Sequence, residues 1–297
     1  MPAILGGGTH LVVQEGWRRF QSLMCADWPV TAKVASDLAR AAGKAILEVY
    51  ASRFTVRFKG PDDPVTDADL RAQEIIVEGL SRAFPQDGIV SEESPVSDEA
   101  RRRPRVWYVD PLDGTGEFVA RTGEFSVIIG LLEEGLPKLG VIYRPIEDVL
   151  YAGVRDETAW ITRGNDRRRT WVSAAAPPHQ LRLAVSRSHR HPLIDTIKAT
   201  LGEVKEISCG SVGAKIGLLI SGEADAYVEP SRYTSKWDVC GAEAILRGAG
   251  GFISDMAGGP IRYDELEIKN TRGFVATNRL CHGDVLAAIP GSALSGL

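Results

Sequence analysis

The stretch Trp107-Tyr-Val-Asp-Pro-Leu-Asp-Gly-Thr-Gly-Glu-Phe118 decides the fold prediction. Val106 to Val109 is a short apolar run of β-prone residues, so it predicts a buried strand that delivers Asp110 to its carboxyl end. Pro111 cannot donate to a strand ladder and therefore ends the pairing. Three residues beyond Asp110, a second carboxylate and a hydroxyl follow in a small-residue turn. The sequence thus predicts a concentrated group of oxygen atoms at the end of one strand.

Asp110 and Asp113 are close enough in the chain to repel each other. Two neighbouring carboxylates are stable when a cation or a shared proton neutralises them, and oxygen ligands favour a hard divalent metal. The alternative is a simple Asp-Pro and Asp-Gly turn, in which the aspartates bond to their own backbone and Gly114 supplies a positive φ. On this stretch alone, the metal site and the turn are equal alternatives.

The composition narrows the class of protein. The 297 residues include 35 basic and 39 acidic side chains, for a net charge of -4, which excludes a general nucleic-acid binder because phosphate-backbone binding needs a dominant basic face. Apolar runs are far shorter than the roughly 20 residues of a membrane span, so no membrane partner is predicted. The four cysteines are widely spaced and lack a C-x-x-C pair. They predict free thiols in a reducing compartment and a cytoplasmic location.

The order of apolar runs and turns predicts an α+β fold in two halves. Residues 1–28 are predicted to be a flexible N-terminal extension, with Thr31 capping the first helix. Residues 29–178 form the N-terminal half, in which successive short strands predict a largely antiparallel sheet. Residues 165–169 are expected to be a polar loop, and a short hinge near residues 174–178 leads to an α/β half over residues 179–297.

Three more acidic positions precede a helix or follow a strand. Asp67 comes just before a predicted helix, and on its own it is best interpreted as a helix-start carboxylate stabilised by the dipole. Glu92 and Glu93 leave an apolar strand, as Asp110 does, at the kind of edge where open α/β sheets bind ligands. Asp238 begins a helix so rich in small residues that it must pack closely. Although a lone Asp there is most often an N-cap, a buried carboxylate needs a partner.

These separate pieces resemble one family. Glu92-Glu93 after a strand, Asp110-Pro-Leu-Asp113-Gly-Thr115, and Trp237-Asp238 at a helix start resemble the lithium-sensitive, magnesium-dependent superfamily of inositol monophosphatases and bisphosphate nucleotidases. The resemblance covers about residues 30 to 285. It is closest to the 3'(2'),5'-bisphosphate nucleotidases, through the motifs Pro64-Val-Thr-Asp67-Ala-Asp, Gly123-Glu-Phe-Ser-Val, Ser186-Arg-Ser-His189, Gly210-Ser211 with Lys215, and Lys236-Trp-Asp-Val-Cys240.

The resemblance implies a layered αβαβα sandwich, a homodimer, lithium sensitivity, and hydrolysis of phosphate monoesters with two or three Mg²⁺ ions. It implies that water attacks directly, without a phosphoenzyme, and that Asp67 and Thr115 form the water-activating pair. The implied metal ligands are Glu92, Asp110, the carbonyl of Leu112, Asp113 and Asp238. The implied substrate contacts are the backbone amides of Gly114 and Thr115, together with Ser186, His189, Ser211, Lys215 and Glu229.

The substrate remains open between two classes. The nucleotidase resemblance implies hydrolysis of adenosine 3',5'-bisphosphate to AMP and phosphate. Glu229, however, resembles the acidic residue with which inositol monophosphatases hold a ring hydroxyl, and Gly116 stands where the nucleotidase branch usually has a basic residue, so an inositol or sugar phosphate is the alternative. A metal-binding regulatory protein that has lost activity is a more distant alternative. The joint presence of Asp67, Thr115 and all four acidic ligands argues against it.

Overall fold

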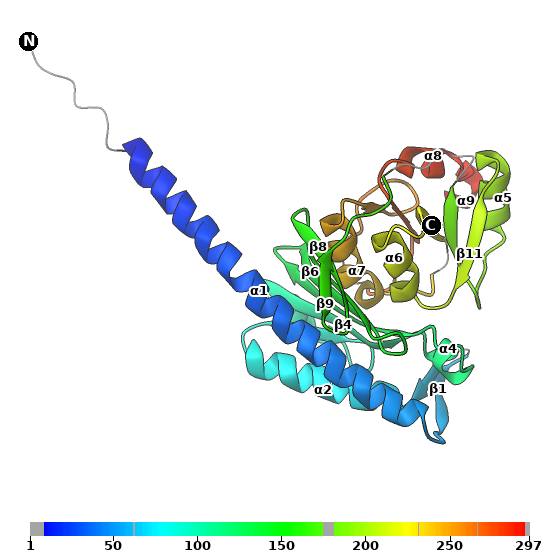
Figure 1. Ribbon diagram of the computed structural model, residues 1–297, viewed down its shortest axis with the longest axis horizontal. Helices are drawn as coiled ribbons and strands as arrows, with labels where there is room; N and C mark the ends of the chain where they lie inside the picture. The colour runs from blue at the N-terminus through cyan, green and yellow to red at the C-terminus, as the bar shows by residue number, and fades with distance from the viewer. Residues whose placement is uncertain (1–8, 62, 175–180, 231, 266, 295–297) are drawn as a thin grey trace, which may run out of the picture.

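The computed structural model describes residues 9–61, 63–174, 181–230, 232–265 and 267–294, with side chains from residue 28 onward. Its helices and sheets alternate in five layers (Figure 1). In order, these are α1 (Thr9–Tyr50) with α2 (Asp67–Ala83), a seven-stranded sheet, α6 (Val212–Ile220) with α7 (Lys236–Gly248), a five-stranded sheet, and α5 (Leu193–Leu201) with α8 (His282–Ala287). The predicted αβαβα sandwich is confirmed.

The first sheet has the strand order β3-β4-β5-β6-β7-β8-β9. Its strands are β3 (Gly88–Ser91), β4 (Arg105–Asp113), β5 (Ser126–Glu133), β6 (Leu136–Arg144), β7 (Val149–Val154), β8 (Thr158–Arg163) and β9 (Asp166–Arg169). Only the β3–β4 pair is parallel, so this sheet is largely antiparallel, as predicted. The polar loop predicted over residues 165–169 is wrong. Asp166–Arg169 form an exposed edge strand, where charged side chains are common and hide the β pattern.

The second sheet has the order β11-β10-β12-β14-β13. Its strands are β10 (Arg182–Ser186), β11 (Lys205–Cys209), β12 (Ala226–Glu229), β13 (Phe252–Ser254) and β14 (Phe274–Thr277). A β1 (Val56–Gly60) and β2 (Asp63–Thr66) hairpin, the short helices α3 (Asp98–Arg101) and α4 (Thr115–Val119), and the terminal α9 (Gly291–Leu294) complete the described elements. Most of the predicted hinge lies outside the described residues, and the boundary between the halves stays a prediction.

The first helix begins earlier than predicted. α1 starts at Thr9, passes through Pro29 and contains Thr31 as a buried interior residue. Because the turn before Thr31 is already helical, the amides that follow it have backbone acceptors and need no side-chain cap. Ala35, Ala39 and Ile46 form the face that α1 buries in the core against α2 and the first sheet.

Three glycines bring α7 into contact with the backbone of the first sheet. A Cβ added at Gly130 in β5 would lie 2.3 Å from the nitrogen of Gly241 in α7, and one at Gly140 in β6 would lie 1.9 Å from the oxygen of Gly241. Any side chain at these positions would push the helix away, because packed interiors leave no such space. The contact places the first turn of α7, and with it Asp238, beside the end of β4.

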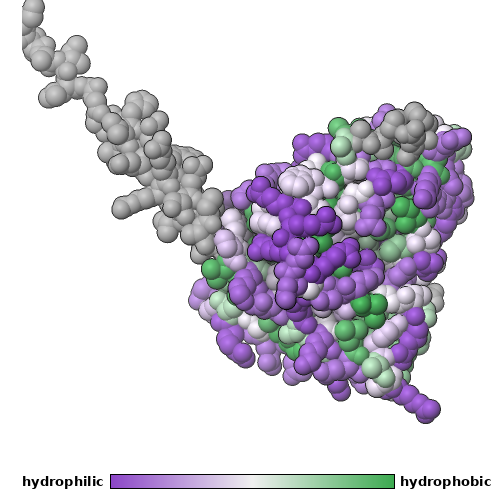
Figure 2. All heavy atoms as spheres, in the orientation of Figure 1, coloured by the Kyte–Doolittle hydropathy of each residue, from purple (hydrophilic) through white to green (hydrophobic). Residues whose placement is uncertain are grey.

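Hydrophilic residues cover most of the face seen in Figure 2, and the coloured hydrophobic residues form small, separate groups on it. Among the described residues, none of the helices is both long enough and apolar enough to cross a membrane.

Candidate metal centre and active site

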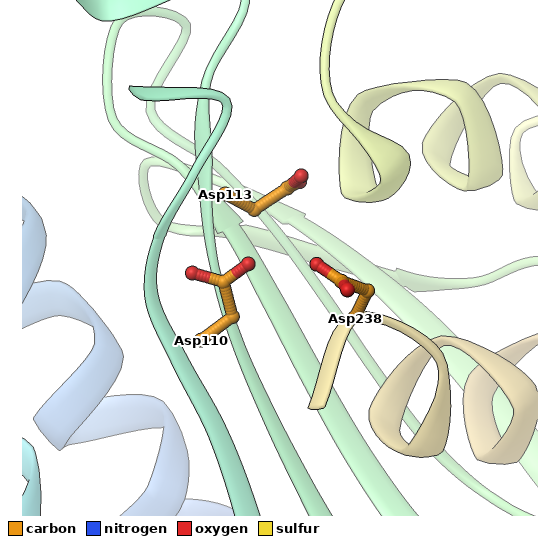
Figure 3. A group of neighbouring side chains, drawn as sticks. All are labelled: Asp110, Asp113 and Asp238. Atoms are coloured by element: carbon orange, nitrogen blue, oxygen red, sulfur yellow. The ribbon is translucent and has the colours of Figure 1, made fainter. Parts of the chain in front are cut away.

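Three aspartates from distant parts of the chain point toward a common centre (Figure 3). Asp110 and Asp113 come from the end of β4, and Asp238 comes from the first turn of α7. One carboxylate oxygen from each lies within 4.8 Å of the others. Between Asp110 and Asp113 the register of β4 against β5 is interrupted, which lets both carboxylates reach the same side. The predicted convergence of Asp238 with the β4 pair is therefore present.

Burial and mutual repulsion raise the pKa values of two of the three aspartates, Asp110 and Asp238. Burial, followed by the charges of Glu92, Asp238 and Asp113, raises the pKa of Asp110 well above its ordinary value. Burial and the charge of Asp113 raise the pKa of Asp238 to about 7. In the metal-free protein, these carboxyl groups therefore hold protons that a metal ion would displace. An all-oxygen donor set of this kind fits Mg²⁺.

Glu92 lies beside this cluster at the end of β3. Its charge raises the pKa of Asp110, and it lines the same cavity, of about 210 Å³, as Asp110, Leu112 and Asp238. The Lys59 ammonium, on β1, donates to Glu92 Oε1 at 2.8 Å and to Glu93 Oε1 at 2.7 Å. Burial lowers the pKa of Lys59, but the two glutamates outweigh it and raise the pKa overall. A lysine thus supplies part of the positive charge that Glu92 requires.

The predicted contact between Asp67 and Thr115 is wrong. Thr115 Oγ1 lies 2.9 Å from Asp69 Oδ1, and it also lies 3.1 Å from the carbonyl oxygen of Leu112. Asp67 is exposed at the first position of α2 and accepts a hydrogen bond from Arg57 at 2.7 Å. It is the helix-start carboxylate that its local sequence indicates.

A capping box explains why Asp69 takes the inward position. Thr66 is the N-cap of α2, and its backbone amide and hydroxyl both donate to Asp69 Oδ2 at 2.7 Å. The third helical residue of a capping box reaches back over the helix start, whereas the first points outward. Burial raises the pKa of Asp69, and its hydrogen bonds with Thr66 and Thr115 oppose that shift. The Thr-x-x-Asp spacing was the sequence signal for this residue.

The predicted substrate residues line the same cavity. Gly114, Thr115, Ser186, His189, Ser211, Lys215 and Glu229 all contribute to its wall. Gly114 has φ +90°, a left-handed conformation that glycine adopts without strain. The Ser186 hydroxyl accepts from the amide of His189, and the Ser211 hydroxyl caps α6 by accepting from the amide of Ala214. These contacts order the cavity wall, and their roles toward a substrate remain predictions.

Lys215 is 3% exposed, and its ammonium lies 5.0 Å above the ring of Tyr227. Tyr227 in turn donates to the buried carboxylate of Glu229 at 2.7 Å. Sequence reasoning missed Tyr227 and also Tyr233, whose ring lies 5.3 Å from that of His189 at the cavity. Tyr227 lies in β12 and Tyr233 in the loop after it. Their rings contact Phe274 and His189, which are more than 40 residues away in the sequence, so no local pattern marks them.

The raised carboxyl pKa values predict how the metal-free protein responds to pH. Because the folded-state pKa of Asp238 is about 7, above the ordinary 3.8, its stabilising contribution is complete below pH 3.8 and is lost as pH rises through 7. In EDTA, we expect the midpoint temperature of thermal unfolding to fall as the pH rises from 5.5 to 7.5. The fall should be about 2–4 °C for each kcal/mol by which the free energy of unfolding decreases. Saturating Mg²⁺ should remove the fall. Scanning calorimetry would contradict this if the EDTA midpoint rose across that window.

The layered sandwich and its buried carboxylate cluster define a class of metal-dependent phosphomonoester hydrolases. The profile of the inositol monophosphatase family matches residues 27–292, and the chain belongs to this family. Its sequence is 38% identical over 244 residues to the 3'(2'),5'-bisphosphate nucleotidase CysQ of Salmonella typhimurium, covering 81% of this chain and 97% of the relative.

Two solved structures share the fold. The extragenic suppressor protein suhB from Bartonella henselae has a TM-score of 0.75 and 28% sequence identity, covering 88% of this chain and 98% of that protein. CysQ from Bacteroides thetaiotaomicron, described as a bacterial member of the inositol monophosphatase family, has a TM-score of 0.73 and 33% identity, covering 85% and 98%. Family and fold therefore agree with the resemblance carried by the motifs.

Proposed function

We propose that this chain is a 3'(2'),5'-bisphosphate nucleotidase that releases the 3'-phosphate of adenosine 3',5'-bisphosphate. The observation that supports this substrate assignment is the environment of Lys215. Its ammonium is buried on the cavity wall, and among the described residues no carboxylate lies within ion-pair distance of it. A buried charge without a partner is costly, so this position favours an anionic ligand group. A bisphosphate has one phosphate for the metal centre and a second for Lys215. The name of the Salmonella relative supports the same substrate.

The carboxylates and carbonyl around the cluster would hold the metal. Glu92, Asp110, the Leu112 carbonyl, Asp113 and Asp238 supply the oxygen donors. When bound, Mg²⁺ would supply positive charge to the phosphoryl oxygens and would lower the pKa of water, so that it can lose a proton and attack as hydroxide. We propose two or three ions in each site.

Thr115 and Asp69 prepare the water. The Thr115 hydroxyl donates its proton to Asp69. The lone pairs of the Thr115 oxygen are then free to accept a hydrogen bond from water. That bond aligns the water, and the carboxylate holds the hydroxyl in this orientation. The amides of Gly114 and Thr115 would receive the phosphate at the turn after Asp113. Direct attack by water is proposed because no side chain in the cluster other than Thr115 could be a nucleophile, and the role of Thr115 here is to accept a hydrogen bond from the water.

The second candidate is an inositol monophosphatase. Glu229 favours it, because a buried carboxylate on the cavity wall can accept hydrogen bonds from ring hydroxyls. Rates of phosphate release from adenosine 3',5'-bisphosphate and inositol 1-phosphate, measured side by side with Mg²⁺, decide between them. We expect kcat/KM for the bisphosphate to be higher by about 10²-fold or more, the value of one strong charged contact. A preference for inositol 1-phosphate would reject the nucleotidase assignment.

Replacing Lys215 by Met tests the second-phosphate site. We expect kcat/KM for adenosine 3',5'-bisphosphate to fall about 10²-fold, because a buried charged hydrogen-bond partner is lost. The same constant for adenosine 3'-monophosphate, which lacks the 5'-phosphate, should change little. Lys205→Met, at an exposed position on β11, is the matched control. An equal loss on both substrates would assign Lys215 a structural role instead.

Three further expectations stay predictions. The resemblance implies a homodimer and lithium sensitivity. A cytoplasmic location is supported by Cys209, Cys240 and Cys281, which are free thiols in the part of the chain that the structure describes.

A further inference from the structure

Ser126 lies directly opposite Asp113 in the β4–β5 ladder. Its side chain has no solvent exposure, and its Oγ lies 2.6 Å from Asp113 Oδ2. The hydroxyl has a single proton, so at this short distance it donates to the carboxylate. Ser126 therefore contacts a predicted metal ligand without itself facing the metal centre.

The first turn of α6 holds the same carboxylate from the other side. The amide of Val212 donates to Asp113 Oδ1 at 2.8 Å, and that of Gly213 donates to Oδ2 at 2.7 Å. A carboxylate accepts about four hydrogen bonds or ligand contacts through its lone pairs. With three taken by Ser126, Val212 and Gly213, Asp113 keeps one direction for a cation. Its orientation is set before any metal arrives.

Gly213 leaves the space that this arrangement requires. A Cβ at this position would lie 2.3 Å from Ser126 Oγ and 3.1 Å from Asp113 Oδ2. The first distance is too short for any side chain, so Ser126 would have to move and release Asp113. A glycine at residue 213 is thus needed for space, while its amide supplies one of the three donors.

We propose that Ser126 and Gly213 are positioning residues that fix Asp113 as a single-oxygen metal ligand. This inference rests on the metal centre of the proposed function. Groups that hydrogen-bond to metal ligands set ligand orientation, and removing one typically costs about 10- to 100-fold in metal affinity. Neither residue touches the substrate, so the effect acts on metal binding before it acts on chemistry.

Isothermal titration of the purified full chain with Mn²⁺, without substrate, tests the proposal directly. We expect Ser126→Ala and Gly213→Ala to weaken Mn²⁺ binding by about 10- to 100-fold. The Mg²⁺ concentration for half-maximal activity should rise by the same factor, while kcat at saturating Mg²⁺ stays near the wild-type value. Thr170→Val is the matched control, because the buried Thr170 hydroxyl donates to the carbonyl of Ile220, at the opposite end of α6 from the contacts with Asp113.

Wild-type Mn²⁺ affinity in a folded Ser126→Ala protein would overturn the proposal, as would an equal loss in Thr170→Val. If Ser126→Ala does not fold, Ser126→Cys provides the same test, because a thiol of similar shape is a weak donor. A wild-type chain that binds no Mn²⁺ would instead reject the metal centre itself, so the two failures can be told apart.

Discussion

Replacing Asp238 by Asn is expected to reduce turnover by at least about 10³-fold, because the metal centre supplies several kcal/mol and each 1.36 kcal/mol is tenfold in rate. The substitution keeps the shape and the capping position at the start of α7 but removes one of the three converging charges. It therefore separates the metal-site function of Asp238 from its helix-start function, which an amide can also perform.

The same variant should have a distinctive stability profile. Removing a charge from the carboxylate cluster relieves repulsion, so the metal-free variant should unfold at a higher temperature than wild type at pH 7.5. The rise in unfolding temperature that Mg²⁺ gives the wild type should be lost. Asp284→Asn, at an exposed position in the first turn of α8, is the control and should leave both properties unchanged. Full turnover in Asp238→Asn would reject the metal centre.

Asp69→Asn is expected to lower kcat by about 10²- to 10⁴-fold, the range for a lost acid–base group. An amide can donate to Thr115 and so reverse the direction of the hydrogen bond that leaves the hydroxyl able to accept from water. Among the contacts that the structure describes, the Asp69 carboxylate bonds to Thr66 and Thr115 and not to the three clustered aspartates. Mn²⁺ affinity should therefore stay close to that of wild type.

Asp67→Asn is the matched variant, two residues earlier on the same helix. Its side chain is exposed and paired with Arg57, and exposed pairs contribute only about 0–1 kcal/mol, so its kcat should be close to wild type. Steady-state kinetics of the two variants, at saturating Mg²⁺, give a direct comparison. A large loss in Asp67→Asn with a small loss in Asp69→Asn would restore the original pairing and contradict the geometry.

The local sequence was sufficient to predict an element where the interactions that form it are between residues close in the chain. The strand that carries Asp110 could be predicted because its apolar run is local. Its predicted end at Pro111 was wrong, because the pairing with β5 is only interrupted after Asp110 and resumes at Asp113, opposite Ser126. The layered fold followed from the motif resemblance, since periodicity alone gives elements without their stacking. Residues 165–169 were mispredicted because an edge strand is stabilised by backbone pairing. The side chains of Arg167 and its neighbours therefore need not be apolar, and their sequence has no alternating apolar pattern.

Orientation and distant partners were harder to predict. Asp67 and Asp69 differ by two positions on a helix, and choosing between them depends on how Thr66 caps that helix. Ser126 lies in the Gly123-Glu-Phe-Ser-Val motif, but the sequence assigned it no role, because a serine in a strand is ordinary until the opposite residue is known. Thr31 was misassigned because cap preference is a weak indication when helical residues precede it.

The direct contact of Gly241 with the strands at Gly130 and Gly140 affects how much the site can change shape when substrate binds. Main-chain atoms have no rotamers to rearrange, so the spacing between the backbone of α7 and the strands of the first sheet has little freedom to adjust. The ligand should therefore fit a site whose backbone is already in place, with adjustment confined to the aspartate side chains and the ligand itself.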